Sequence, residues 1–174
     1  LLPSLCFAED ITIYNLVRAE SDTMFRMIMK DNGIDIGELF HEREVTSANA
    51  PQPVIRPNQD TLYSGTIIDL SEPVTVTLPE ADGRFQSVLV ISQDHFSFAY
   101  AEPGSYKLTE EEVGTRFAML LFRTFVDAGD PDDAARAHAV QNGIVLEGGG
   151  KGPFEAPDWD LEALAEARKA VNDL

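Results

Sequence analysis

Residues 74–92 read VTVTLPEADGRFQSVLVIS, and this stretch decides the fold. Residues 74–78 alternate apolar side chains with threonine, which is typical of a strand that buries one face. Residues 79–83 have the composition of a turn, and residues 84–92 are predicted to return as the partner strand. The run SVLVI shows no alternation, so we expect both faces of this second strand to be covered.

Strand patterns continue on both sides of this pair. They occur at residues 61–70, 96–101, 105–108 and 116–126. Gly65, inside the first of them, predicts a bulge or a close approach of another segment. Residues 35–53 show little periodicity and predict a long excursion with one short element near Leu39 and Phe40.

Helical patterns lie towards both ends of the chain. Residues 11–31 carry apolar side chains at helical spacing, and Asn32-Gly33 is a common signal for the end of a helix. A second helix is predicted over residues 130–142, with Asp130 as its cap, and a third over residues 158–173. Between these two helices, the segment EGGGKGP is predicted to be a flexible linker.

The order of these elements is one helix, then many strands, then two helices, which is typical of an α+β fold. We therefore expect a mainly antiparallel, β-sandwich-like sheet with an N-terminal helix and two C-terminal helices. The chain has 174 residues, which is enough to bury a core, and we expect one β-rich domain over residues 9–174.

The composition limits the partners. The net charge is −17, from 13 Lys and Arg against 30 Asp and Glu. A surface this negative repels phosphate backbones and anionic lipid headgroups, so neither nucleic acid nor a membrane surface is expected as a partner.

Cys6 is the single cysteine, which excludes an intrachain disulfide. His41, His95 and His138 do not occur at H-x-x-H or H-x-H spacing, and we expect neither a metal site nor a cofactor.

The N-terminal residues predict export. Residues 1–8, LLPSLCFA, are apolar and end in the small-x-Ala pattern of Cys6, Phe7 and Ala8, directly before Glu9. This pattern is typical of the end of a signal peptide, and it predicts a periplasmic or secreted protein. The alternative is a short apolar arm that packs on the domain.

The segment RPNQDTLYS, which begins at Arg56, gathers a cation, an amide, a carboxylate and three hydroxyls beside a strand. Asn58 and Asp60 can bond nearby backbone amides and fix a turn. Asp60 can also hold Arg56 or orient the Tyr63 hydroxyl. The candidate catalytic residues are therefore Tyr63 and Asp60, and the candidate substrate-binding residues are Arg56, Asn58 and Thr61. The alternative is a structural polar corner where a loop enters a sheet.

With two more residues this stretch reads VIRPNQDTLYS, and it resembles the signature of the family catalogued as domain of unknown function 1254, which usually reads V-I-R-x-N-R-D-T-L-Y-S. Further segments agree with the resemblance, in order along the chain: VRAESD at 17–22, DH at 94–95, Gly-Ser-Tyr at 104–106, GTRF at 114–117, RTFVD at 123–127 and DPDDAARAHAVQ at 130–141. Gln59 departs from the arginine that the family often has, so a role for a second cation there has no support.

The resemblance implies a β-sandwich-like domain with peripheral helices, and some members are labelled as esterases. It implies no catalytic mechanism that could be assigned to these residues. Members usually continue past a helix like residues 158–173 into a further β-rich domain. The chain is therefore expected to be either a short member or an N-terminal portion whose last helix leads into an absent second domain.

Asp94-His95 ends the predicted buried strand SVLVISQ and forms a second candidate. Histidine is suited to proton transfer near neutral pH, so His95 is a candidate catalytic acid or base. Neighbouring strand residues point to opposite faces, so Asp94 is not expected to orient His95, whereas Asp60 or Glu102 could. The alternative is a satisfied structural histidine at the end of a strand.

Other polar residues carry weaker signals. Ser64 lacks the G-x-S-x-G spacing of a nucleophile elbow. Arg116 and Arg123 are expected to pair with the abundant carboxylates rather than to bind an anionic ligand.

Two functions remain open from the sequence. One is an exported small-molecule enzyme, such as a hydrolase, that uses a polar pocket around RPNQDTLYS and His95. The other is a non-catalytic binding or assembly module in which that motif is a structural corner. Exposed strand edges also favour a homo-oligomer.

Overall fold

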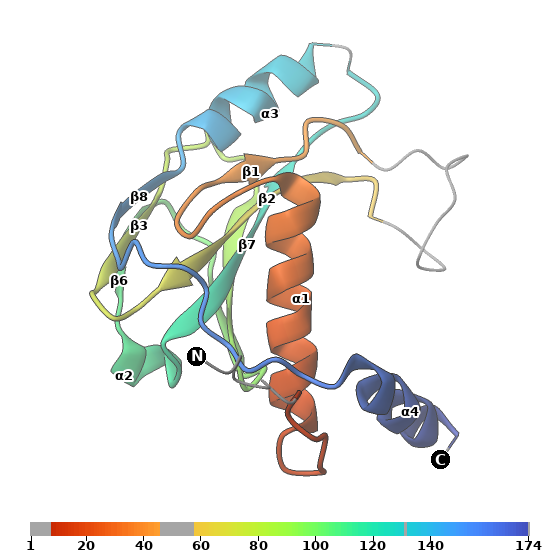
Figure 1. The fold of residues 1–174 in the computed structure, drawn as a ribbon. Coiled ribbons are helices and arrows are strands. Elements are labelled where there is room, and N and C mark those ends of the chain that lie inside the picture. The colour runs from red at the N-terminus through yellow and green to blue at the C-terminus, as the bar shows by residue number, and fades with distance from the viewer. Residues whose placement is uncertain (1–7, 46–57, 131, 174) are drawn as a thin grey trace.

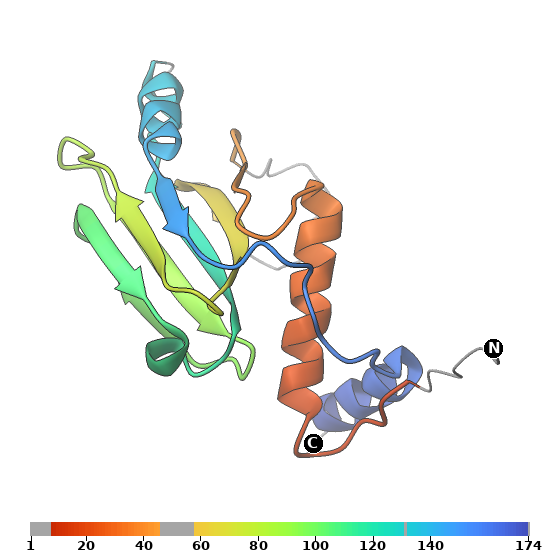
Figure 2. The same cartoon turned by 60° about the vertical axis from the view of Figure 1, so that its left-hand side comes forward.

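The computed structural model describes residues 8–45, 58–130 and 132–173. Their strands form two sheets that face each other (Figures 1 and 2). In chain order the strands are β1 (Phe40–His41), β2 (Thr61–Asp69), β3 (Val74–Leu78), β4 (Gln86–Ser92), β5 (Ser97–Tyr100), β6 (Gly104–Leu108), β7 (Phe117–Phe125) and β8 (Val145–Gly148). The helices are α1 (Leu16–Asn32), α2 (Glu110–Val113), α3 (Asp133–Asn142) and α4 (Leu161–Asn172).

This architecture confirms the predicted α+β fold with mainly antiparallel sheets. The larger sheet has the order β1-β2-β7-β4-β5, and the smaller sheet has the order β6-β3-β8. Helix α1 stands against the outer face of the larger sheet, and α3 lies at one end of the sandwich (Figure 2). Helix α4 packs beside the first turns of α1, near the other end.

The predicted pairing of residues 74–78 with residues 84–92 is wrong. Strand β3 pairs with β6 and β8 in the smaller sheet, whereas β4 pairs with β7 and β5 in the larger one. Val76 of β3 and Val88 of β4 are buried in one cluster between the two sheets. Because the strands stack face to face, the apolar face of β3 is covered by the larger sheet, which pairing within one sheet would not achieve.

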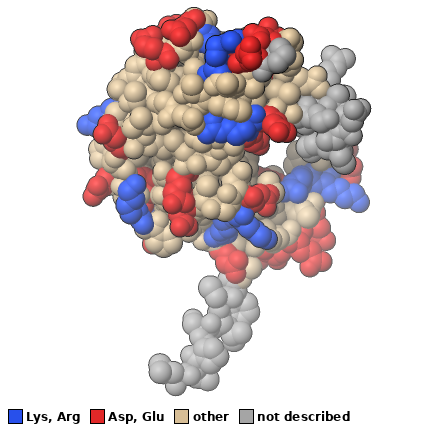
Figure 3. All heavy atoms as spheres, turned by 90° about the horizontal axis from the view of Figure 1, so that it is seen from above, with Lys and Arg blue, Asp and Glu red and all other residues tan. Residues whose placement is uncertain are grey.

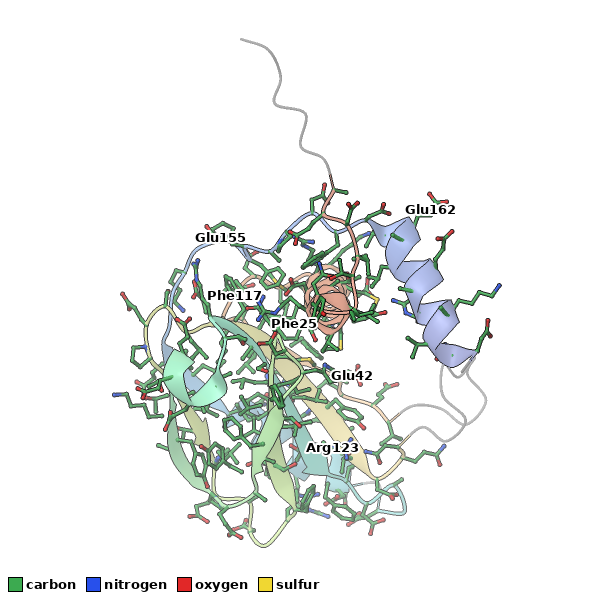
Figure 4. The ribbon with its side chains drawn as sticks, turned by 90° about the horizontal axis from the view of Figure 1, so that it is seen from below. Phe25, Glu42, Phe117, Arg123, Glu155 and Glu162 are labelled. Carbon is green, nitrogen blue, oxygen red and sulfur yellow. The ribbon has the colours of Figure 1, made fainter. Side chains whose placement is uncertain are left out.

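The outer face of the larger sheet is buried under α1. Phe25 of α1 packs with Ile67 of β2 and Phe117 of β7, and Ile91 of β4 belongs to the same cluster. Figure 4 shows Phe25 and Phe117 in this layer. The Phe154 ring completes it, 4.8 Å from the Phe117 ring between centroids. Strand β4 is therefore covered on both faces, as its unbroken apolar run predicts.

Gly65 makes the close approach that its place in a strand predicts. The ring of Phe40 lies against it, and a Cβ atom on Gly65 would be 2.7 Å from that ring. Phe40 and His41 form β1 and pair with Gly65 and Ser64. The short element predicted near Leu39 and Phe40 is therefore confirmed.

Helix α1 begins later than predicted and ends where expected. The Asn15 side chain accepts a hydrogen bond from the backbone N–H of Thr12 at 2.7 Å, and this bond holds the residues before Leu16 in a turn. At the other end Gly33 has a φ of 61° and closes the helix in the left-handed conformation that glycine favours.

The predicted linker at residues 147–153 is not free of structure. Strand β8 runs into it, and Gly148 has a φ of 83°. A Cβ atom on Gly148 would collide with the carbonyl oxygen of Pro73. The glycines here therefore permit a close approach to the start of β3, in place of the flexibility that their composition suggests.

Two sequence predictions fall outside the described residues: the signal-peptide end at residues 1–7 and the substrate-binding role of Arg56. None of the helices described above combines the length and the apolar composition of a membrane span.

Candidate functional site

The RPNQDTLYS corner forms a hydrogen-bonded turn that leads into β2. The Asn58 side-chain amide donates to the hydroxyl oxygens of Thr61 and Tyr63, the second at 3.3 Å. The Asn58 side-chain oxygen accepts from the backbone N–H of Asp60 at 2.9 Å. Asp60 itself is exposed, and its backbone carbonyl accepts from Val126. Asn58, rather than Asp60, is therefore the residue that contacts the Tyr63 hydroxyl.

Arg123 on β7 and Arg116, just before β7, differ in their partners. Arg116 binds Asp69 at 2.9 Å and Glu155 at 2.6 Å, as predicted, and its hydrogen bonds hold the pKa of Asp69 below the usual range. Arg123 instead lies over the Tyr63 ring, 5.5 Å from the ring centroid, which is within cation–π range. Figure 4 shows Arg123 far along β7 from Phe117.

His95 lies in the turn between β4 and β5, where its φ is 64°. Its Nδ1 atom is 3.2 Å from the hydroxyl oxygen of Ser21 on α1. Arg18 binds Asp94 at 2.6 Å, so Asp94 does not orient the imidazole.

A sealed polar cluster lies beside His95. Asp22 of α1 is fully buried, and its two carboxylate oxygens accept from the Gln93 amide at 2.7 Å and from the Trp159 indole at 3.0 Å. The Gln93 side-chain oxygen in turn accepts from the backbone N–H of Phe117. We call this region, with His95, Ser21 and the Asp22 cluster, the His95 end of the sandwich.

The structure places the Tyr63 corner and His95 at opposite ends of the larger sheet. Through the pairing of both strands with β7, Tyr63 on β2 lies level with Ser87 on β4. In the same way Ser92 on β4, which precedes His95, lies level with Ile68 on β2. Ile68 is five residues beyond Tyr63, or about 17 Å at roughly 3.3 Å per residue. The structure therefore does not bring these two candidates into one site.

A Ser–His contact that the sequence did not signal joins β1 to β2. The Nδ1 atom of His41 is 2.7 Å from the Ser64 hydroxyl oxygen, which also accepts from the Gln141 amide at 3.1 Å. Burial, and secondarily the charge of Arg43, lower the pKa of His41. Ser64 is fully buried, so it cannot present a nucleophile to a substrate. This contact therefore ties β1, β2 and α3 together.

A hollow of about 760 Å³ opens at the α3 end of the sandwich, between α3 and the loop that joins β3 to β4. Figure 3 looks onto this end and shows acidic side chains along its upper margin. The lining residues are Pro79, Glu80, Ala81, Asp82, Gly83, Arg84, Phe85, Phe125, Asp127, Asp130, Asp133, Arg136, Ala139 and Val140. We call this feature the α3-end hollow.

An ion pair from two distant segments fixes the base of the α3-end hollow. Arg84 donates to both carboxylate oxygens of Asp133, at 2.5 and 2.8 Å, and to the backbone carbonyl of Phe125 at 2.6 Å. Hydrogen bonds from Arg84, and then from the backbone N–H of Asp127, hold the pKa of Asp133 far below its usual range. The same carboxylate raises the pKa of Arg84. Both groups therefore stay charged at neutral pH.

A second arginine extends this network along α3. Arg136 binds Asp130 at 2.6 Å and Asp133 at 2.8 Å. Hydrogen bonding to Arg136 lowers the pKa of Asp130, whose side chain also accepts from the backbone N–H of Asp132. The sequence predicts Asp130 as the helix cap, but α3 begins at Asp133 and Asp130 serves the ion-pair network instead.

Aromatic side chains meet these charges in the hollow. Phe85 and Phe125 both line it, with exposed fractions of 52% and 40%. Phe125 N donates to the Phe85 carbonyl, so backbone pairing holds the two residues together. An arrangement of fixed charges and open apolar rings is suited to binding a small molecule. Within the described part of the chain, no three His, Cys, Asp or Glu side chains converge to hold a metal ion.

Sequence reasoning missed the residues of this hollow. The Arg84–Asp133 pair joins residues 49 positions apart, so no local sequence pattern indicates it. The spacing of Asp133 and Arg136 is a usable signal, because residues three apart on a helix face the same side. The walls also come from RTFVD and DPDDAARAHAVQ, two segments that carry the family resemblance.

The fold and the hollow define an α+β sandwich domain with a candidate ligand site at the α3 end. Residues 36–109 match the model of the family described as "Protein of unknown function (DUF1254)". This match confirms the family resemblance of VIRPNQDTLYS over these residues.

A solved structure supports the fold over more of the chain. The chain is similar to the VPA0106 protein from Vibrio parahaemolyticus, with a TM-score of 0.62 and 19% identity. The similarity covers 87% of this chain and 43% of that one, so the chain spans less than half the length of this relative. At this identity the likeness shows the fold alone. A search of the curated proteins finds no match.

Proposed function

We propose that the chain is a small-molecule-binding domain of an exported protein, and that the ligand occupies the α3-end hollow. The observation that carries the proposal is a space of about 760 Å³ whose lining combines fixed charges with two half-exposed phenyl rings. Ligand sites in proteins are typically concave, have volumes of about 300–1,000 Å³ and place a few polar groups among apolar ones.

Binding is favoured over catalysis by the state of the titratable groups. General acid or base catalysis works best when the pKa of the group lies near the operating pH. Asp133 and Asp130 have lowered pKa values because arginines hold them, and the pKa values of Arg84 and Arg136 are raised. These four groups can orient a ligand through fixed charge, and they are poorly suited to move a proton at neutral pH.

The Tyr63 corner supports the proposal as a structural element. Its side chains bond to one another through Asn58. The backbone carbonyl of Asp60 accepts from the backbone N–H of Val126, the residue that directly follows β7. The corner therefore helps to fix the strand end that supplies Phe125 to the hollow. This matches the alternative in which RPNQDTLYS is a structural corner.

A blocking variant tests the proposed site. Ala139 is exposed and lines the hollow, so Ala139→Trp should fill it with little cost in stability. Ala135 is exposed on the same helix outside the lining, and Ala135→Trp is the matched control. We expect small molecules that raise the melting temperature of the wild type to lose this effect in Ala139→Trp and keep it in Ala135→Trp. Hits that stabilise both variants equally would place the ligand elsewhere.

Export is supported by the apolar residues 1–8 and the small-x-Ala pattern before Glu9. N-terminal sequencing of the protein purified from its natural source should find a mature chain that starts at Glu9. A mature chain that retains residues 1–8 would contradict export by this route.

A further inference from the structure

The edge strands of the two sheets differ in how they are protected. Among the described residues the larger sheet ends in β1 and β5, and the smaller one ends in β6 and β8. A free edge presents unpaired backbone groups, and proteins usually keep such edges short or place charged side chains on them. Strand β1 has two residues, while exposed Lys107 lies on β6 and exposed Glu147 on β8. Residues 96–101, FSFAYA, carry no charge and no proline, so β5 is the edge that is open to another strand.

The backbone groups of this edge alternate between two directions. The backbone N–H of Ser92 donates to the carbonyl of Phe96 at 2.9 Å, which places Phe96 in a hydrogen-bonded position towards β4. Every second residue of an antiparallel ladder bonds to the same neighbour, so the even-numbered residues of 96–100 face β4. The odd-numbered residues direct their N–H and C=O groups to the free side, and all of them are exposed: Ser97, Ala99 and Ala101, which directly follows β5.

The spacing of these free groups is complementary to itself. A second copy related by a two-fold axis through Ala99 sets Ala99 opposite its own equivalent and Ser97 opposite Ala101. Each of these pairs then exchanges both of its N–H···O bonds. A two-fold axis through Phe98 would instead set Ala101 opposite His95, whose φ of 64° takes it out of the strand. The backbone therefore favours the register centred on Ala99, and an isologous contact of this kind closes into a dimer.

The side chains of β5 match in the same register. Phe98 and Tyr100 lie on the inner face, with their ring centroids 5.8 Å apart, and Tyr100 stacks on Tyr106 of β6 at 4.0 Å. The register centred on Ala99 places Phe98 opposite Tyr100 of the second copy, and aromatic pairs across antiparallel strands are stabilising. The outer face carries only small side chains at the odd-numbered positions, so it offers no obstacle to a second strand.

Charge also favours this edge as the place where two copies meet. The chain has a net charge of −17, so two copies repel each other over most orientations. Residues 96–101 carry no charge, and Phe96 is 77% exposed just before β5. Apolar area is therefore available here without a local carboxylate to desolvate. Salt screens the remaining repulsion, so association through this edge is expected to tighten as salt is added.

We propose that the protein forms a two-fold dimer in which the β5 strands of two copies pair in antiparallel orientation and join the larger sheets into one. A contact of one short strand buries a small area, so the dimer is weak and depends on concentration. This inference does not rest on the proposed ligand site, because no residue of β5 lines the α3-end hollow.

Sedimentation velocity over a series of protein concentrations tests the dimer with two matched variants. The wild type should dimerise reversibly, and its dissociation constant should fall between about 50 and about 500 mM NaCl. Ala99→Lys places an ammonium group at the two-fold axis beside its own equivalent, and the dissociation constant should rise at least about tenfold. Val145→Lys adds the same charge to the exposed edge of β8 and should dimerise as the wild type does.

Hydrogen exchange of the wild type gives a second measurement that does not depend on the folding of a variant. The amides of Ser97, Ala99 and Ala101 should exchange fast in dilute solution and slowly in concentrated solution, while those of Phe98 and Tyr100 exchange slowly in both. A wild type that stays monomeric at every concentration and salt, or a dimer that survives Ala99→Lys, overturns the proposal. So does a dimer lost only in Val145→Lys, or one in which the three amides still exchange fast.

Discussion

At the His95 end of the sandwich, Asp22 is enclosed, and neutral donors from Gln93 and Trp159 satisfy both of its carboxylate oxygens. At the α3 end, Arg84 and Asp133 are fixed just as firmly, but they border an open space of about 760 Å³. In a closed interior, polar groups whose hydrogen bonds are all satisfied fix how the side chains pack. Beside a hollow, the polar groups next to such a satisfied pair remain free to bind a ligand. Polar character alone therefore does not separate a structural cluster from a candidate site.

The largest expected effect is at the sealed cluster. Asp22→Ala leaves the Gln93 amide and the Trp159 indole without an acceptor, and it should lower the free energy of unfolding by about 3 kcal/mol. Urea unfolding measures the loss. The emission of Trp159, the single tryptophan, should also shift to the red as its site opens.

The control for this prediction lies on the same helix. Glu20 binds Arg168 at 2.7 Å in a largely exposed pair, so Glu20→Ala should lower the free energy of unfolding by less than about 1 kcal/mol. A similar cost for both variants would show that the Asp22 cluster is not the sealed structural element that the comparison requires.

A smaller effect is expected from acid at the α3 end. The folded-state pKa of Asp133 is lowered, chiefly by Arg84, so its contribution to stability is present above the ordinary carboxyl pKa and is lost as the pH falls through the folded value. Asp133→Asn should therefore be less stable than the wild type at pH 6, and the difference should narrow below about pH 4.

Chemical denaturation at a series of pH values checks this behaviour. Asp94→Asn is the matched control, because Asp94 and Arg18 form an exposed pair that contributes little. If the difference in the free energy of unfolding between the wild type and Asp133→Asn stays constant from pH 6 to pH 3, the role of the Arg84–Asp133 pair is contradicted.

Local patterns predicted the elements of the fold well. The alternation of VTVTL identifies β3, and Asn32-Gly33 marks the end of α1. The pairing of β3 with β4 was predicted wrongly, because alternation shows that a face is buried and does not show which sheet covers it. Strand β8 was missed because it is short and runs into glycines whose composition resembles a linker.

The candidate site was less predictable than the fold. The sequence correctly gathered Asn58, Thr61 and Tyr63 into one corner, because Asx turns are encoded within a few residues. It could not locate His95 relative to that corner, since their separation depends on the strand register across the larger sheet. The Arg84–Asp133 pair depends on a contact between the β3–β4 loop and the start of α3, which are distant in sequence.

Backbone amide chemical shifts test the central contrast between the two ends most directly, when they are followed by NMR while a small molecule that stabilises the wild type and not Ala139→Trp is added. The account predicts shifts confined to residues 79–85 and 125–140, with Gln93, His95 and the Trp159 indole unchanged. Shifts centred on Gln93, His95 and Trp159, with the α3-end hollow silent, would contradict it.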